Sequence, residues 1–126
     1  MKRIVSILLT IFIGLSANAQ IPELYNHENG TQLLIGGEPF IILGGELANS
    51  SASCGEYMDG RGTWRYLSDS GLNTVLAPVY WELIEPEEGR YDFRSVDYLL
   101  KSARANGQKL ILLWFGSWKN SMSCYA

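Results

Sequence analysis

The sequence has few of the side chains on which metal binding and nucleophilic catalysis depend. Its 126 residues include one histidine, His27, which lies in a polar stretch, and two cysteines, Cys54 and Cys124. Neither cysteine has a histidine close to it in the sequence, so we expect no metal site and no cofactor. The two cysteines are 70 positions apart (124 minus 54) and carry no disulfide signature, which leaves their pairing open.

Strong positive charge is also missing. The formal net charge is −3, with 10 Lys and Arg against 13 Asp and Glu, and the basic residues are scattered. Such a chain has no basic field that would attract phosphates, so nucleic acid is not an expected partner. No glycine-rich phosphate-binding motif opens a predicted helix, and this argues against a nucleotide-binding domain.

No apolar run is long enough to cross a bilayer, which takes roughly 20 residues. The longest run, residues 4–15, follows Lys2 and Arg3 and precedes a small-residue motif, Ala-Asn-Ala, at 17–19. This is the pattern of a secretory signal peptide. We expect residues 1–19 to be removed before Gln20, which leaves no stable membrane span and predicts export to the periplasm or the extracellular space. A membrane anchor, the alternative, would need a longer run.

Cleavage leaves 107 residues (126 minus 19), enough for one hydrophobic core. Residues 20–31 form a polar lead-in without periodicity, so the first ordered element is expected at 32–35. A Gly-Gly-Glu-Pro sequence then predicts a tight turn into the apolar run 40–43. The sequence therefore predicts a short hairpin that leads into a first core strand at 40–43.

Helical and strand patterns alternate after this hairpin. The expected elements are a helix within 57–70 ended by Gly71, a strand at 72–79, a helix at 93–105 begun by Asp92 or Ser95 and ended by Asn106-Gly107, and a strand at 110–115. The strands start near positions 40, 73 and 109, at the spacing of strand–helix units in a parallel sheet. This predicts an α/β fold, without deciding between a closed barrel and an open sheet.

Polar and aromatic residues follow each predicted strand, and in parallel α/β folds this end of the sheet carries function. Aromatic faces cover the apolar patches of a sugar ring while carboxylates and amides bind its hydroxyls. Trp81 and Trp114 have an alternative role, which is to fill space between sheet and helices. Glu82 and Glu85 belong to one loop and would approach from one side, so we do not interpret them as a catalytic pair. Candidate sugar-binding residues are Glu46, Asn49, Trp81, Trp118, Lys119 and Asn120.

Three ordered motifs carry a family resemblance. They are residues 43–53 (LGGELANSSAS), residues 71–74 (GLNT) leading into 81–93 (WELIEPEEGRYDF), and residues 113–120 (LWFGSWKN). With these motifs the chain resembles the N-terminal part of the catalytic barrel of glycoside hydrolase family 35, β-galactosidase-like enzymes related to family 42. The resemblance assigns residues 32–126 to about three strand–helix units of a (β/α)₈ barrel.

The resemblance implies a retaining O-glycosyl hydrolase that acts on β-linked galactosides in oligo- or polysaccharides. It also implies two catalytic glutamates at the ends of the fourth and seventh barrel strands, so none of the residues present is assigned a catalytic role. A complete barrel takes about 250 residues, and we therefore expect this chain to be an inactive part of the enzyme. The alternatives are a non-catalytic carbohydrate-binding module that uses the aromatic residues and a structural α/β domain in which every Trp is core.

Overall fold

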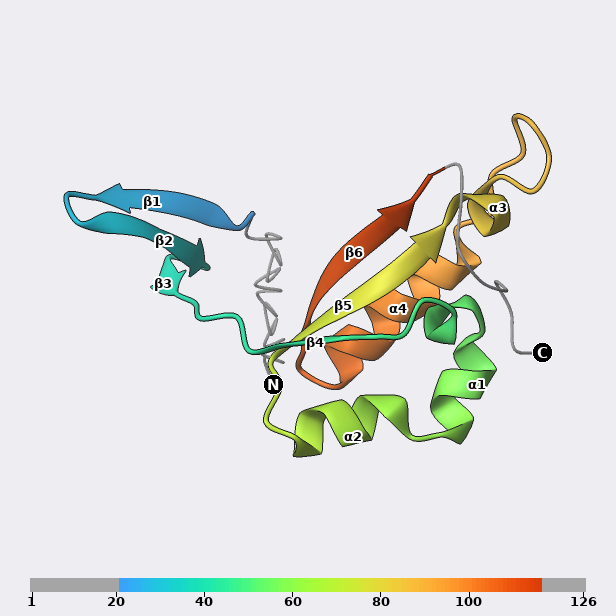
Figure 1. Cartoon of the computed structure of the whole chain (residues 1–126), viewed down its shortest axis with the longest axis horizontal. Coiled ribbons are helices and arrows are strands. Elements are labelled where there is room, and N and C mark those ends of the chain that lie inside the picture. The colour runs from blue at the N-terminus through green and yellow to red at the C-terminus, as the bar shows by residue number, and fades with distance from the viewer. Residues whose placement is uncertain (1–20, 117–126) are drawn as a thin grey trace, which may run out of the picture. The chain divides into compact units, whose positions relative to one another are not determined.

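The computed structural model describes residues 21–116, and the chain divides after Ile41 into two compact units. Figure 1 shows a small β unit, in blue and teal, and a larger unit in which helices accompany a sheet. Among the described residues, no helix has the length and apolar character that a membrane crossing requires. The predicted signal peptide lies outside the described residues.

The first unit is an antiparallel meander of three strands. Strand β1 (Glu23–His27) pairs with β2 (Gly30–Ile35), which pairs with β3 (Glu38–Pro39). Gly36 and Gly37 connect β2 to β3 with φ of 69° and 80°, the left-handed backbone that a two-residue hairpin turn favours. The predicted hairpin is thus confirmed, but two predicted boundaries are wrong. An ordered strand, β1, lies before residue 32, where the sequence predicted an unstructured lead-in. The returning strand of the hairpin, β3, ends at Pro39, and residues 40–43 form no strand.

The second unit contains a parallel sheet in the order β4-β5-β6, from β4 (Gly44–Glu46), β5 (Thr74–Tyr80) and β6 (Lys109–Phe115). The predicted parallel arrangement is confirmed. The first core strand is Gly44–Glu46, however, and not residues 40–43. A Cβ on Gly45 would lie 2.6 Å from Leu72 Cδ1, so this strand packs closely because it begins with glycines, and not because it is apolar.

Helices connect the strands. They are the 3₁₀ turn η1 (Ser51–Ser53), α1 (Gly55–Gly60), α2 (Thr63–Asp69), α3 (Trp81–Ile84) and α4 (Arg94–Ala105). The single helix predicted within 57–70 is in fact two helices, because the chain turns at Gly62 with a φ of 61°. The helix predicted at 93–105 is confirmed as α4. Asp92 contributes to its start, where Asp92 Oδ1 accepts a hydrogen bond from the backbone N–H of Arg94 at 3.0 Å.

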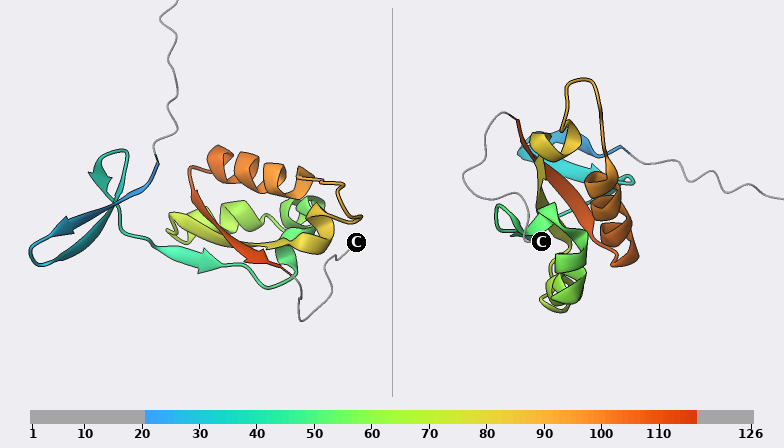
Figure 2. Two further views of the ribbon diagram at one scale, coloured as in Figure 1. Left: turned by 90° about the horizontal axis from the view of Figure 1, so that it is seen from above. Right: turned by 90° about the vertical axis from the view of Figure 1, so that its right-hand side faces the viewer.

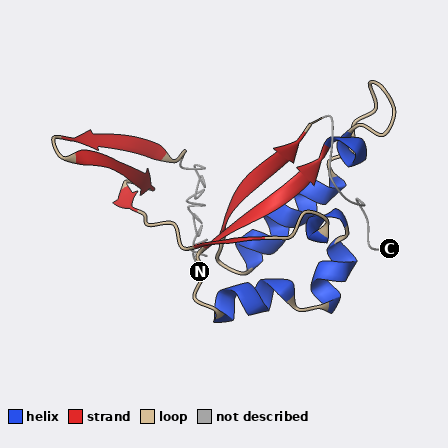
Figure 3. Cartoon of the chain, viewed as in Figure 1, coloured by secondary structure: helices blue, strands red, loops and turns tan. Residues whose placement is uncertain are grey.

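Both predicted glycine stops are confirmed and share one geometry. The N–H of Gly71 donates to Ser68 O and that of Leu72 to Leu67 O, while Gly107 and Gln108 donate in the same way to Arg104 and Ala103. Each pair is a Schellman motif, with the glycine in the left-handed region at φ of 75° and 67°. Each motif delivers the chain from a helix into the next parallel strand, as Figure 3 shows.

The core lies between the helices and one face of the sheet. Val75, Ala77 and Val79 of β5 pack in one cluster with Met58, Trp64, Leu67, Leu99 and Ala103 of the helices. Alternation along β5 points Leu76 and Pro78 to the opposite face. We call this second face, which contributes no member to the helical core, the helix-free face. The two views in Figure 2 show α4 running along the sheet.

Candidate functional site

The carboxyl ends of the parallel strands form one edge of the sheet, and short helical segments begin there. Strand β4 leads through a turn into η1, and β5 leads directly into α3, so that Trp81 follows Tyr80 without a linker. Figure 1 shows α3 and the loop after it at this end. The edge therefore gathers two of the three segments that the sequence predicts to bind sugar.

Glu46 ends β4 on the helix-free face. A Cβ on its neighbour Gly45 would point toward Leu72 and Leu67 in the helical core, so Glu46 points the other way. Its register partner is Leu76, and its side chain is exposed among the described residues. An exposed carboxylate beside an apolar strand can accept hydrogen bonds from a ligand's hydroxyl groups.

Asn49 lies in the turn that follows β4, where serines stabilise the backbone. Ser51 Oγ donates to Ala48 O at 2.7 Å and Ser53 Oγ donates to Ser50 O at 2.7 Å. Asn49 is half-buried and already has an interaction within the protein. The hydroxyl groups of Ser51 and Ser53 therefore stabilise the backbone of this turn, which follows directly after Glu46.

Trp81 belongs to a row of aromatic side chains. Its ring centroid lies 6.0 Å from that of Trp114 and 6.3 Å from that of Tyr91, and Tyr91 in turn stacks on Phe93 at 6.3 Å. We call these four residues the aromatic surface. Within residues 21–116 they are 38–59% exposed, so Trp81 and Trp114 lie at the surface and do not fill the space between sheet and helices.

Glu46 and Trp81 are not brought together, although both lie toward one edge. Strand β5 continues for four residues beyond Leu76, the partner of Glu46, and at about 3.3 Å per residue it ends about 13 Å farther along. Trp114 points to the same face of β6 as Leu110 and Leu112, which pack on the helical core, and Trp81 lies next to Trp114. The two predicted sugar contacts therefore belong to opposite faces of the sheet.

Glu82 and Glu85 have different environments. Glu85 Oε1 accepts a hydrogen bond from the backbone N–H of Gly89 at 2.7 Å, so this carboxylate stabilises the turn after α3. Glu82 instead lines a cleft of about 680 Å³ between η1, α1, α3 and the start of α4. The other charged groups of this cleft are Glu56, Asp59, Asp92 and Arg94, so its lining is mainly acidic.

Two interactions organise this cleft. Arg94 Nε donates to both carboxylate oxygens of Asp92, at 2.9 and 2.8 Å, and this hydrogen bonding lowers the pKa of Asp92 to about 2. Tyr98 OH donates to Asp59 Oδ1 at 2.7 Å and accepts from Trp64 Nε1 at 3.0 Å. Burial, followed by the hydrogen bond to Asp59, raises the pKa of Tyr98.

Sequence reasoning missed this cleft because its walls come from four separate elements. Two local features of the sequence relate to the cleft. Asp92 and Arg94 are spaced to pair at the start of α4, and Gly55 is the first residue of α1. Cys54 also lines the cleft and is half-buried. Cys124, Trp118, Lys119 and Asn120 lie outside the described residues. Between residues 21 and 116, no group of three His, Cys, Asp or Glu side chains has an arrangement that could hold a metal ion.

The class of protein is indicated by a family match over the central part of the chain. Residues 61–114 match the model of glycoside hydrolase family 42, described as "Beta-galactosidase". The match begins two residues before α2 and ends one residue before the end of β6. The chain thus resembles glycoside hydrolases in the segment that forms the strand–helix–strand unit and the aromatic surface. The matching family is 42, and the resemblance to family 35 remains a prediction.

A particular relative points the same way. The chain is 32% identical over 111 residues to "Beta-galactosidase" of Xanthomonas manihotis, an alignment that covers 84% of this chain and 18% of that protein. The chain therefore spans about a fifth of the length of this curated relative. A solved family 39 glycoside hydrolase from the gut symbiont Bacteroides cellulosilyticus WH2 superposes with a TM-score of 0.44 at 16% identity, over 68% of this chain and 18% of that one. A score this low does not define a shared fold.

Proposed function

We propose that this chain forms the first strand–helix units of a (β/α)₈ barrel in a β-galactosidase-type glycoside hydrolase and contributes to its sugar-binding rim. The observation that carries the proposal is the position of the family match. Residues 61–114 cover α2, β5, α3 and α4 and reach Trp114 in β6, so the similarity falls on a complete parallel strand–helix–strand unit. Such units, repeated, build a barrel whose active site lies at the carboxyl ends of the strands.

The chemistry assigns a binding role to these residues. Retaining hydrolysis needs two carboxyl groups about 5 to 5.5 Å apart on opposite sides of the scissile bond. Glu85 is engaged with Gly89, and Glu82 lines the cleft beside the helices, so neither faces a partner across the helix-free face. Glu46 lies on this face, where it would bind hydroxyl groups of a β-linked galactoside. Trp118, Lys119 and Asn120, which follow β6 in the sequence, complete the proposed rim.

A kinetic comparison tests this function. The 126-residue chain should not hydrolyse an aryl β-galactoside, because a missing nucleophile and proton donor abolish the mechanism. A protein that carries this chain with all eight barrel strands should hydrolyse it. In that protein Glu46→Ala and Trp118→Ala should each lower kcat/KM by about 10- to 100-fold, the effect of one or two sugar contacts of about 1.4 kcal/mol each.

Glu88→Ala is the matched control, because Glu88 is an exposed carboxylate in the turn after α3 and should leave kcat/KM unchanged. Turnover by the 126-residue chain would contradict the assignment of the catalytic residues. Wild-type kinetics in both Glu46→Ala and Trp118→Ala would contradict the proposed rim.

We also propose that the protein is exported after cleavage before Gln20, on the evidence of the basic start, the apolar run and the Ala-Asn-Ala motif. Amino-terminal sequencing of the protein recovered from outside the cytoplasm should therefore begin at Gln20. Recovered protein that still began at Met1 would show that the segment is retained.

A further inference from the structure

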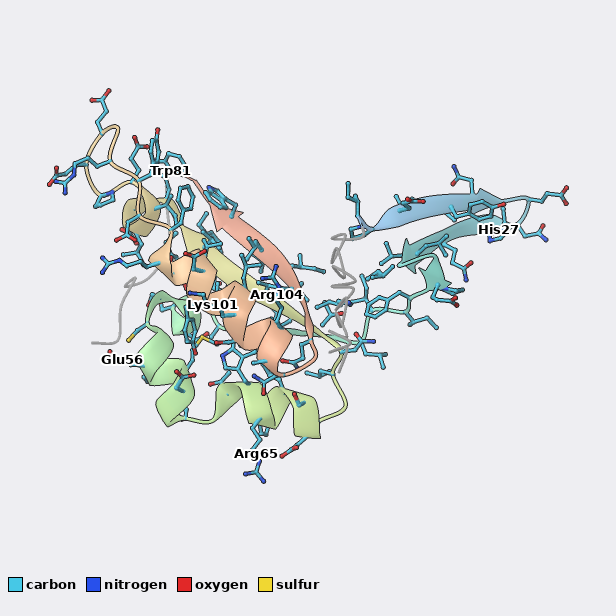
Figure 4. The ribbon with its side chains drawn as sticks, turned by 180° about the vertical axis from the view of Figure 1, so that it is seen from behind. His27, Glu56, Arg65, Trp81, Lys101 and Arg104 are labelled. Atoms are coloured by element: carbon cyan, nitrogen blue, oxygen red, sulfur yellow. The ribbon has the colours of Figure 1, made fainter. Side chains whose placement is uncertain are left out.

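The aromatic surface is continuous across three elements that are separate in the sequence. Trp114 comes from the end of β6, Trp81 from the start of α3, and Tyr91 and Phe93 from the segment before α4. Each ring lies 6.0–6.3 Å from the next, so the row runs Trp114, Trp81, Tyr91, Phe93. Figure 4 shows Trp81 beside the loop at the end of the sheet. A row of this kind extends farther than a single sugar ring can cover.

The exposure of these rings distinguishes them from the aromatic residues that stabilise the fold. Trp64 and Tyr80 are 5% and 2% exposed, whereas Tyr91, Phe93 and Trp114 are 59%, 49% and 46% exposed. Aromatic rings in contact with water are unfavourable, and contiguous exposed apolar groups mark binding surfaces. Within residues 21–116, the stability of the fold therefore does not explain why these exposed rings lie together.

The loop that presents Tyr91 is held in place by its own hydrogen bonds. Glu85 Oε1 accepts the N–H of Gly89 at 2.7 Å, Arg90 N–H donates to Glu87 O at 2.9 Å, and Asp92 N–H donates to Ile84 O at 2.7 Å. Gly89 takes a φ of 77° that allows the turn. Because the loop is fixed before any ligand arrives, a ligand on Tyr91 pays little ordering entropy.

Two ion pairs lie next to the rings, among a majority of carboxylates. Arg90 forms an ion pair with Glu87, and Arg94 forms one with Asp92. The border of the aromatic surface, residues 82–94, adds Glu82, Glu85 and Glu88 to these pairs, so five carboxylates stand against two arginines and the formal charge of this segment is −3. An anionic ligand would gain little from this border, whereas a neutral sugar can use both the ring faces and the polar groups.

We infer that the aromatic surface binds an extended, neutral β-linked galactan chain on the face of the sheet opposite Glu46. The identity of the sugar rests on the proposed function, while the binding surface rests on the rings, their exposure and the fixed loop. The plane of the Trp81 ring is inclined by 56° to that of Trp114 and by 70° to that of Tyr91, so the galactan chain would turn as it follows the row and would contact each ring with a different sugar unit. Polymeric galactan would then be held through this surface in addition to any contact made by Glu46.

Affinity electrophoresis of the 126-residue chain through a gel that contains soluble β-linked galactan tests the inference. The wild-type chain should be retarded relative to a gel that contains dextran. Tyr91→Ala and Phe93→Ala should each weaken galactan binding about tenfold or more, because each removes one ring of the row. Tyr91→Phe keeps the ring and should keep most of the retardation.

The matched control is Tyr66→Ala, which removes a tyrosine that is 72% exposed on α2, away from the aromatic surface. This variant should bind galactan as the wild type does, and far-ultraviolet circular dichroism should show that all variants fold. Absence of galactan retardation in the wild type, or equal loss in Tyr66→Ala and Tyr91→Ala, would overturn the inference. Self-association of the wild type that Tyr91→Ala abolishes, without galactan binding, would assign the surface to protein contact and also overturn it.

The outcome is independent of the kinetic test of the proposed function. Galactan retardation that depends on Tyr91, together with no hydrolysis by the complete barrel, would support this inference and contradict the proposed function. Hydrolysis by the complete barrel without any retardation would support the function and contradict this inference.

Discussion

Gly55 lies against the ring of Tyr98 and has no space for a side chain. A Cβ at this position would lie 2.8 Å from Cδ2 and Cε2 of that ring. The ring cannot easily retreat, because its hydroxyl is hydrogen-bonded to Asp59 and Trp64. We therefore predict that Gly55→Ala destabilises the protein by about 1–3 kcal/mol, the usual cost of overpacking, measured by urea denaturation.

Gly60→Ala is the control for this substitution, because Gly60 is in the same helix and a Cβ there would meet nothing within 4 Å. It should be neutral or stabilise the fold by up to about 1 kcal/mol, since alanine is the better helix former. Equal stability of the two variants would show that the contact between Gly55 and Tyr98 does not form.

Tyr98 also makes the stability depend on alkaline pH. Burial raises its pKa above the ordinary value of 10.0, so the folded protein favours the neutral phenol. This contribution is fully present below about pH 10 and is lost as the pH rises through the raised pKa. Tyr98→Phe should cost about 1 kcal/mol at neutral pH by removing the hydrogen bonds, and it should lack the additional alkaline loss.

Denaturation of both proteins between neutral pH and a pH above that of the raised pKa measures this difference. An alkaline loss that is the same in wild type and Tyr98→Phe would assign the effect to other groups. A spectrophotometric titration of tyrosine should in addition show one phenol fewer titrating late in the Tyr98→Phe variant.

At the scale of the elements, the two Schellman motifs predict matched effects. Gly71 and Gly107 have φ of 75° and 67°, where a Cβ is strained. Gly71→Ala and Gly107→Ala should each destabilise the fold by about 1–2 kcal/mol, the cost of a left-handed conformation in a residue with a side chain. Thermal unfolding measures this, and unchanged midpoints in both variants would mean that the helix ends rearrange freely.

The elements that could be predicted from the sequence are those whose burial or capping leaves a local trace. Strands β5 and β6 appear in the sequence as apolar runs, and α4 shows apolar residues on one side and a glycine stop. Strand β1 has five exposed residues and is defined by its pairing with β2, which no periodicity in the sequence reveals. Residues 40–43 mislead for the opposite reason, since they are apolar but Ile41 is 78% exposed.

The same reasoning separates what could be predicted about the candidate site. Glu46 and Trp81 follow strands, so their place near the carboxyl edge follows from a parallel sheet. That they belong to opposite faces depends on register and on the length of β5, which the sequence alone does not specify. The acidic cleft depends on the break at Gly62 and on the one-turn helix α3, neither of which has a periodic signal.

At the scale of the whole molecule, the helix-free face determines how the isolated chain behaves. Among the described residues this face carries Leu76, Ile111 and Leu113, and strands β4 and β6 each have a neighbour on one side only. Such a face and such edges promote association. We predict that the 126-residue chain binds the dye ANS, and that Leu113→Lys lowers the dye fluorescence by placing a charge on the face.

Tyr66→Lys is the control, because it replaces an exposed aromatic residue on α2 and leaves the helix-free face intact. It should not change the dye fluorescence. An equal decrease in both variants would show that ANS does not bind at the sheet.

Strand β5 has β4 on one side and β6 on the other, and this position has a consequence for amide hydrogen exchange. Residues 74–76 of β5 have a paired strand on both sides, β6 pairs with the whole of β5, and Val75, Ala77 and Val79 lie in the core. Amides open with free energies that range from nearly zero at exposed segments to the full unfolding free energy in the centre of a fold. The amides of β1, all in exposed residues, should exchange first, and those of β5 should exchange last, so that their rate measures the opening of the whole sheet.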